Sequence, residues 1–360
     1  MLKIHTFEMK KGFLTDNEFA YIRNNLKAGY QYSHFENSQR YNYYAEKGIE
    51  IILIRCKYVP NTMTIKINPQ KVLGIEKQQN LFELSETEFM KCLESVYEIL
   101  EKNKIVLTEF KISRLDFTQD IWFDKSEIID IYIKLLNKTG APYRYKKMYS
   151  KEKYKTSFNI ITNTNDWEIA VYNKERESKN RNKRNGIMYG VMRTEVRIFA
   201  PTEMNQIFSN GILHFDRVIK MQELANIILS NAFVDGFYIK LDKTKNILSK
   251  KYYSRNITKR QQNGIQKMIE LSETIAIHRS LYDCIRGTDT IYSYDTIKNI
   301  KKRFVEERIN LVSICANEHF SVLPDMKYIL GIKSEIEKER DNQFLARNKL
   351  LNKLPTYKIL

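Results

Sequence analysis

The chain has 360 residues, of which 42% are hydrophobic and 12% aromatic, so it can bury a sizeable core and is not a disordered chain. Its net charge of +17 points to a polyanionic partner such as a nucleic acid. No apolar run reaches the roughly 18–20 residues of a membrane span, and the N-terminus lacks an apolar signal core. We therefore expect a cytoplasmic protein without a membrane partner.

The predicted elements begin with strands between residues 40 and 68, where Pro60 marks a turn between two apolar stretches. A helix follows, because Ser85 and Glu88 form a capping-box pattern ahead of apolar residues at helical spacing. Ser126 predicts the start of another helix, which runs to about residue 136. Alternation of apolar and polar residues predicts four further strands: 111–122, 157–162, 167–173 and 191–199.

The rest of the chain is predicted to be mostly helical. Ser293 is a good N-cap for a helix that ends near Arg308, and the turn at 287–290 separates it from an earlier helix. This pattern is typical of a helix-turn-helix, although a plain helical hairpin with a solvated basic face has the same pattern. The stretch 333–349 predicts a charged, exposed helix.

These elements predict an α+β fold, with an antiparallel sheet, helices on one of its faces and a mostly helical C-terminal module. The expected domains are a sheet domain, a helical connector, a helix-turn-helix-like DNA-binding module and a charged helical tail, at 1–200, 201–255, 256–330 and 331–360.

One face of the strands 111–122, 167–173 and 191–199 carries polar residues, because side chains alternate between the two faces of a strand. They are Arg114, Asp116, Asp120, Glu168, Tyr172, Arg193, Glu195 and Arg197. Such a face suits a divalent cation, a nucleophile and a phosphate. The five histidines are isolated in sequence, so a metal here, Mg²⁺ or Mn²⁺, would need carboxylates, and Asp116, Asp120 and Glu195 are the best set. The alternative is that the arginines and carboxylates form salt bridges on a solvated face.

Five short motifs occur in an order that resembles the filamentous-phage gene II/gene X replication proteins and related plasmid rolling-circle initiators (Rep proteins). They are Ile65-Lys-Ile-Asn-Pro-Gln-Lys-Val-Leu-Gly74, Ile112-Ser-Arg-Leu-Asp116, Ile169-Ala-Val-Tyr-Asn-Lys-Glu175, Met192-Arg-Thr-Glu-Val-Arg197 and a C-terminal series within 281–312. An insertion at 174–190 and the absence of the usual aromatic residue after Ser293-x-x-Thr depart from the family pattern.

The resemblance implies a Rep/relaxase-like nicking domain whose tyrosine attacks a DNA phosphodiester, becomes linked to the 5′ phosphate and releases a 3′-OH primer. Tyr172-Asn-Lys174 matches the family's Tyr-x-Lys motif. A phenol has a pKa near 10, so a cation and Lys174 would help it to react. The tyrosines of 143–154 and Tyr189 are competing candidates.

We therefore expect a plasmid or phage replication initiator that nicks one strand of origin DNA. Its expected partners are double-stranded origin DNA, single-stranded DNA and the host helicase and polymerase. Expected DNA contacts are Arg114, Arg193, Arg197, Lys298, Lys301, Lys302 and Arg303. A conjugative relaxase and a non-catalytic DNA-binding replication or regulatory protein are the alternatives.

Overall fold

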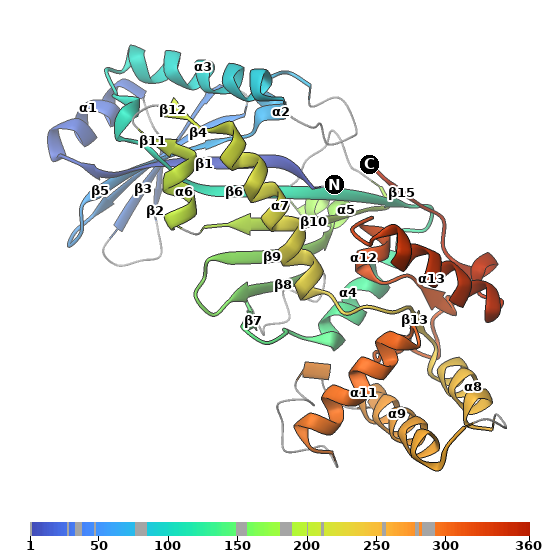
Figure 1. Ribbon diagram of the computed structural model, residues 1–360. Coiled ribbons are helices and arrows are strands. Elements are labelled where there is room, and N and C mark those ends of the chain that lie inside the picture. Colours follow the sequence, from blue (N-terminus) through green and yellow to red (C-terminus); the bar gives the residue numbers. More distant parts are fainter. Residues whose placement is uncertain are drawn as a thin grey trace.

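A large antiparallel sheet organises the fold of the computed structural model (Figure 1). The structure describes residues 2–26, 29–32, 38–46, 48–75, 85–148, 157–180, 189–199, 201–209, 212–253, 257–277, 281–282 and 292–360. Within these residues, the sheet has eleven strands. Ten of them follow the order β2-β3-β4-β5-β1-β6-β10-β9-β8-β7, and the eleventh, β15, pairs with β6. The α+β class predicted from the sequence is confirmed.

The strands are β1 (Lys3–Leu14), β2 (Gly29–Tyr32), β3 (Ser38–Glu46), β4 (Ile49–Cys56), β5 (Asn61–Ile67), β6 (Lys111–Phe123), β7 (Tyr145–Lys147), β8 (Ser157–Thr162), β9 (Trp167–Asn173), β10 (Val191–Ile198), β11 (Phe208–Ser209), β12 (Ile212–Leu213), β13 (Tyr238–Ile239), β14 (Val322–Leu323) and β15 (Tyr357–Ile359). The helices are α1 (Asp16–Leu26), α2 (Pro69–Val72), α3 (Glu86–Lys102), α4 (Glu127–Thr139), α5 (Lys174–Asn180), α6 (Pro201–Ile207), α7 (Phe215–Ala232), α8 (Leu241–Tyr252), α9 (Lys259–Ile277), α11 (Tyr294–Glu306), α12 (Met326–Ile329) and α13 (Glu335–Arg347). Two short 3₁₀ turns cover Leu107–Glu109 and Leu351–Lys353.

Helices cover the apolar face of the sheet. The ring of Phe7 in β1 stacks on Phe89 of α3 at 4.7 Å, and Phe123 of β6 packs against Tyr132 of α4 at 5.6 Å. Helices α6 and α7 pack against β6 and β10 on this side. The capping box predicted at Ser85 is present and starts α3, whereas the predicted cap at Ser126 makes no side-chain hydrogen bond.

Strand β1 lies in the middle of the sheet, between β5 and β6, and sequence analysis missed it. Its pairing with β6 shifts register between Ile4 and Thr6 and again between Glu8 and Met9. Such bulges place extra residues in a strand and break the two-residue alternation that identifies strands. The missed strand contributes His5 to the candidate site described below.

The charged helix predicted at 333–349 is present as α13, and most of its side chains are exposed or half-buried. The expectation of a fully exposed stretch is wrong at Lys333 and Asp341, which are buried, and the Lys333 ammonium lies 2.6 Å from Asp341 and 2.5 Å from Asp325. Strand β15 then pairs with the end of β6, on the edge that β1 leaves free.

Helices α8, α9 and α11 form a separate lobe, at the bottom right of Figure 1. The boundary expected at residue 256 divides α8 from α9, although these two helices pack against each other. The turn expected at 287–290 lies outside the described residues. None of the helices in the described part of the chain is long and apolar enough to cross a membrane.

Candidate active site on the polar face of the sheet

The register of three neighbouring strands builds the candidate site as three rows that run across β6, β10 and β9. The rows are Asp120–Arg193–Tyr172, Thr118–Glu195–Ala170 and Asp116–Arg197–Glu168. Gly190 helps to fix this register. It has a φ of +66°, and a Cβ there would lie 2.5 Å from the carbonyl oxygen of Phe123.

Arginine–carboxylate pairs fill these rows. Both Arg193 nitrogens that face Asp120 lie 2.6 Å from its carboxylate oxygens. The Arg197 guanidinium bridges Glu168 and Glu195, again at 2.6 Å to each. Arg114 and Asp116 form a third pair with two contacts of 2.6 Å.

The polar face is buried. The alternative of salt bridges on a solvated face is therefore wrong about solvation, although the salt bridges themselves are present. Asp116, Asp120, Arg193 and Glu195 are each no more than 5% exposed. A buried charge without a partner is costly, so loss of either member of one of these pairs should destabilise the folded protein. Replacement of Asp116 or Glu195 by Ala would leave Arg114 or Arg197 with one carboxylate instead of two, Glu8 or Glu168. Amide substitutions disturb these pairs less and are better probes of function.

The three carboxylates chosen as metal ligands do not come together around one point. Asp116 and Asp120 are four residues apart along β6, roughly 13 Å at the rise of an extended strand. One Mg²⁺ with ligand distances of about 2.1 Å cannot reach both. Among the described residues, no group of three or more His, Cys, Asp or Glu side chains is placed to hold a metal ion.

Asp116 and Glu195 remain a candidate pair. They are diagonal neighbours across β6 and β10, for which Cβ atoms are about 7–8 Å apart. Burial raises the pKa of Asp116 to about 6, against the opposing effect of Arg114, and the negative charge of Glu195 adds to the rise. A cation between them would relieve that repulsion, provided that Arg114 and Arg197 turned away.

Tyr172 lies within this network. Its hydroxyl donates to Glu195 Oε1 at 2.6 Å, and Arg193 is its cross-strand partner in β10. Burial and the Glu195 carboxylate raise the phenol pKa well above its ordinary value, while Arg193 acts in the opposite direction. The tyrosine is therefore neutral, and its hydroxyl donates its proton in a hydrogen bond to the Glu195 carboxylate.

Lys174 directly follows β9 and begins α5. The Asn173 side chain accepts the backbone N–H groups of Glu175 and Arg176 and so turns the chain into the helix. The Lys174 ammonium lies 2.7 Å from Glu177 and 5.7 Å from the centre of the Tyr172 ring. Burial lowers its pKa, and Arg193 lowers it further.

His5 is the member of the site that sequence analysis did not connect with it. Its Nε2 lies 3.1 Å from Arg193 Nη1, so β1 contributes to a cluster otherwise built from β6, β9 and β10. The sequence carries no signal for this contact, because 188 residues separate the two side chains and a bulge displaces His5 in β1.

The expected phosphate contacts of α11 fall into two groups. Lys298 and Lys302 are exposed. Lys301 instead donates to the Tyr282 hydroxyl at 3.1 Å, and the Arg303 guanidinium lies against Gly264 of α9. The N-cap predicted at Ser293 is present, since its hydroxyl accepts the backbone N–H of Thr296.

Replacement of both Lys298 and Lys302 by Ala should weaken binding to duplex DNA and flatten its salt dependence. Each lost phosphate contact lowers the slope of log K against log salt by about 0.9, so the pair should lower it by about 1.8. Fluorescence anisotropy from about 50 to 200 mM salt measures this slope. The matched control replaces Lys91 and Lys102, two exposed lysines of α3. An equal change in both double variants would argue against a DNA-binding role for α11.

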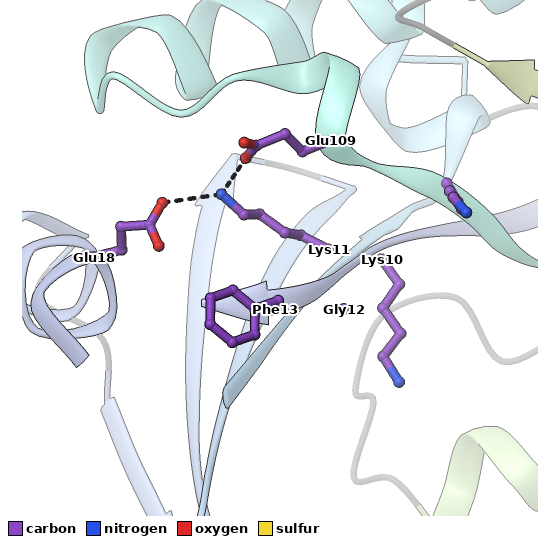
Figure 2. Close-up of a pocket in the computed structure, with 7 residues that line it drawn as sticks. Lys10, Lys11, Gly12, Phe13, Glu18 and Glu109 are labelled. Atoms are coloured by element: carbon purple, nitrogen blue, oxygen red, sulfur yellow. Dashed lines mark hydrogen bonds and ion pairs between the residues drawn. The ribbon is translucent and has the colours of Figure 1, made fainter. Parts of the chain in front are cut away.

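A cavity of about 580 Å³ lies away from this site, where β1 and β6 pair near Lys10 and Lys111. Figure 2 shows Lys11 directed at Glu18 and Glu109, which it binds, while Lys10 points to the other side of β1. Lys111 is nine residues from Asp120 along β6, roughly 30 Å in an extended strand. The cavity is thus separate from Tyr172.

Neither the protein-family models nor the curated proteins that we compared with the chain gave a match. The family resemblance of the short motifs stays a prediction.

Proposed function

We propose that this protein is a replication initiator of the rolling-circle type, which cleaves one DNA strand through Tyr172. The observation that carries the proposal is the 2.6 Å hydrogen bond from the Tyr172 hydroxyl to Glu195. This bond provides a proton acceptor for the candidate nucleophile, the Tyr172 hydroxyl. Arg193 and Lys174 lie beside the Tyr172 side chain. An oxygen nucleophile, an acceptor and cations are the groups that phosphodiester cleavage needs.

In the proposed reaction the Tyr172 oxygen forms a bond to phosphorus, and the bond from phosphorus to the 3′ oxygen breaks. The phenol proton passes to Glu195, and the departing 3′ oxygen takes a proton from water. Arg193 and Lys174 stabilise the charge on the phosphate oxygens. Asp116 and Glu195 are the residues that would hold Mg²⁺ or Mn²⁺, which when bound polarises the phosphate.

A second candidate is a non-catalytic DNA-binding protein of replication or regulation. It is favoured by the completeness of the ion pairs, because Asp116, Asp120 and Glu195 each have an arginine at 2.6 Å. Such a network also serves simply to hold β6, β9 and β10 together. A covalent protein–DNA product distinguishes the enzyme from this alternative.

The test uses a pool of random single-stranded oligonucleotides labelled at the 3′ end, with Mn²⁺ present, and denaturing electrophoresis. Attachment to a 5′ phosphate leaves the 3′ label on the protein, whereas a 5′ label leaves with the released fragment. Tyr172→Phe should abolish the labelled adduct and retain DNA binding. Tyr189→Phe, which changes a tyrosine that is 64% exposed, should retain both.

Peptide mapping of the adduct decides the assignment. If Tyr172→Phe still forms it and the label maps to Tyr189 or to Tyr149 or Tyr154, which lie outside the described residues, then Tyr172 is not the nucleophile. If the wild-type protein forms no adduct with any oligonucleotide or with supercoiled DNA, the non-catalytic candidate is favoured.

A further inference from the structure

His5 makes a contact that fixes the position of its proton. Its Nε2 lies 3.1 Å from a nitrogen of Arg193, and a guanidinium has only donors. Nε2 must therefore accept, which leaves the proton on Nδ1. Burial, and then the charge of Arg193, hold the pKa of His5 well below its usual value, so the ring is neutral.

The Nδ1–H group of His5 is buried and has no hydrogen-bond partner among the described residues. The hydroxyl of Thr118, which is 0% exposed, also has no hydrogen-bond partner among these residues, and neither does Nε of Arg197. Buried donors without partners are uncommon, because each costs about 1–3 kcal/mol. Their occurrence on one face of the sheet suggests that a ligand completes them.

These unpaired donors lie on three neighbouring strands, β1, β6 and β10. His5 is in β1 and contacts Arg193 in β10, so the two side chains meet over the intervening strand β6. Thr118 is on that strand, in register with Lys3 on one side and Glu195 on the other. Arg193 is also the cross-strand neighbour of Tyr172, which joins this place to the proposed nucleophile.

The surroundings of His5 favour an anion. Arg193, Lys174 and Lys66 impose positive charge on the imidazole, and Glu195 is the opposing carboxylate. A neutral Nδ1–H and a guanidinium Nε–H can only donate, so an oxygen of negative charge suits them better than a further donor.

We propose that His5 Nδ1 and the Thr118 hydroxyl bind an oxygen of a DNA phosphate and so position the backbone beside Tyr172. This inference rests on the proposed function and adds a phosphate-binding position to it. Both residues are positioning residues, because the bonds that change are those of Tyr172 and the scissile phosphate.

The experiment measures binding in the Tyr172→Phe background, so that it does not depend on cleavage. The probes are a fluorescein-labelled dT₁₂ strand, its uncharged methylphosphonate analogue and inorganic phosphate as competitor. His5→Asn keeps a donor near the Nδ1 position, and His5→Gln keeps an acceptor near Nε2. Thr118→Val removes a buried hydroxyl at nearly constant shape.

We expect His5→Gln and Thr118→Val each to weaken dT₁₂ binding roughly tenfold, the effect of one hydrogen bond to a charged group. His5→Asn should stay within about twofold of the parent, since it keeps the donor. The methylphosphonate strand should bind all four proteins equally. Thr118→Val should not melt earlier than the parent, because the hydroxyl has no partner among the described residues.

Three results would overturn the proposal. Unchanged dT₁₂ affinity in Thr118→Val removes the hydroxyl from the site. A loss in His5→Asn with full affinity in His5→Gln shows that His5 acts through Arg193. Competition by inorganic phosphate that depends on His5, without any effect of His5 on dT₁₂ affinity, assigns the position to a free phosphate instead of DNA. The adduct test on Tyr172 is read separately, so either proposal can fail alone.

Discussion

Replacement of Arg193 by methionine should lower the free energy of unfolding by about 3–5 kcal/mol, the cost of breaking a buried ion pair from one side. Asp120, its partner, is 1% exposed and would keep a charge in the sheet interior without the two 2.6 Å contacts that now compensate it. The hydrogen bond to His5 would be lost as well. Urea unfolding followed by circular dichroism measures the change.

Two further variants show whether the pair, rather than side-chain volume, is responsible. Asp120→Leu combined with Arg193→Met removes both charges and should recover most of the loss, because a buried pair replaced by apolar groups is often neutral. Arg114→Met should cost less, since the Arg114 side chain is 21% exposed, against 5% for the side chain of Arg193. A loss below about 1 kcal/mol for Arg193→Met, the value of an exposed pair, would contradict the buried network.

Much of the sheet could be predicted from the sequence, because alternation identifies strands when one face is apolar. The strands β6, β8, β9 and β10 start and end within two residues of their predicted limits, and alternation also assigned Asp116, Tyr172 and Glu195 to the polar side. It could not show that the polar side is buried. That property depends on which segments cover a strand, and two-residue periodicity describes only the strand itself.

The grouping of residues within the site needed the structure. Cross-strand register decides that Asp120 meets Arg193 and that Asp116 does not, and a sequence does not carry register between strands more than 70 residues apart. His5 was missed for the same reason and because of its bulge. The charged composition of the tail predicted the exposed helix α13, but it could not show that Lys333 and Asp341 pair in the interior.

Glu195 occupies the position from which the effect on catalysis should be largest. Burial alone would favour its neutral form, but Arg197 and Arg193 outweigh burial and hold its pKa at about 2. It is therefore ionised at any pH at which the protein works, and its Oε1 accepts the Tyr172 proton at 2.6 Å. No other described carboxylate has a hydrogen bond to this phenol.

Glu195→Gln should slow formation of the covalent DNA adduct by about 10²-fold, the low end of the range for removal of a general base, because a carboxylate with a pKa of about 2 is a weak base. Glutamine keeps one oxygen, which can still accept from Arg197, and Arg197 also keeps Glu168, so the sheet should stay folded. The amide nitrogen that then faces the phenol cannot take up its proton. The loss should be similar from about pH 6 to 9, because a carboxylate with a pKa of about 2 does not titrate there. Single-turnover assays with the 3′-labelled oligonucleotides measure it.

Glu168→Gln is the matched control for this change. Glu168 is 6% exposed, against 5% for Glu195, and accepts from the same guanidinium of Arg197 at 2.6 Å. It makes no described contact with Tyr172. Its cross-strand partner in β10 is Arg197, whereas the cross-strand partner of Tyr172 is Arg193. The control should thus lose less than about tenfold in rate, well below the range for a general base. Equal losses in the two variants would mean that both carboxylates act by holding Arg197, and the proton would then have to leave Tyr172 by another route.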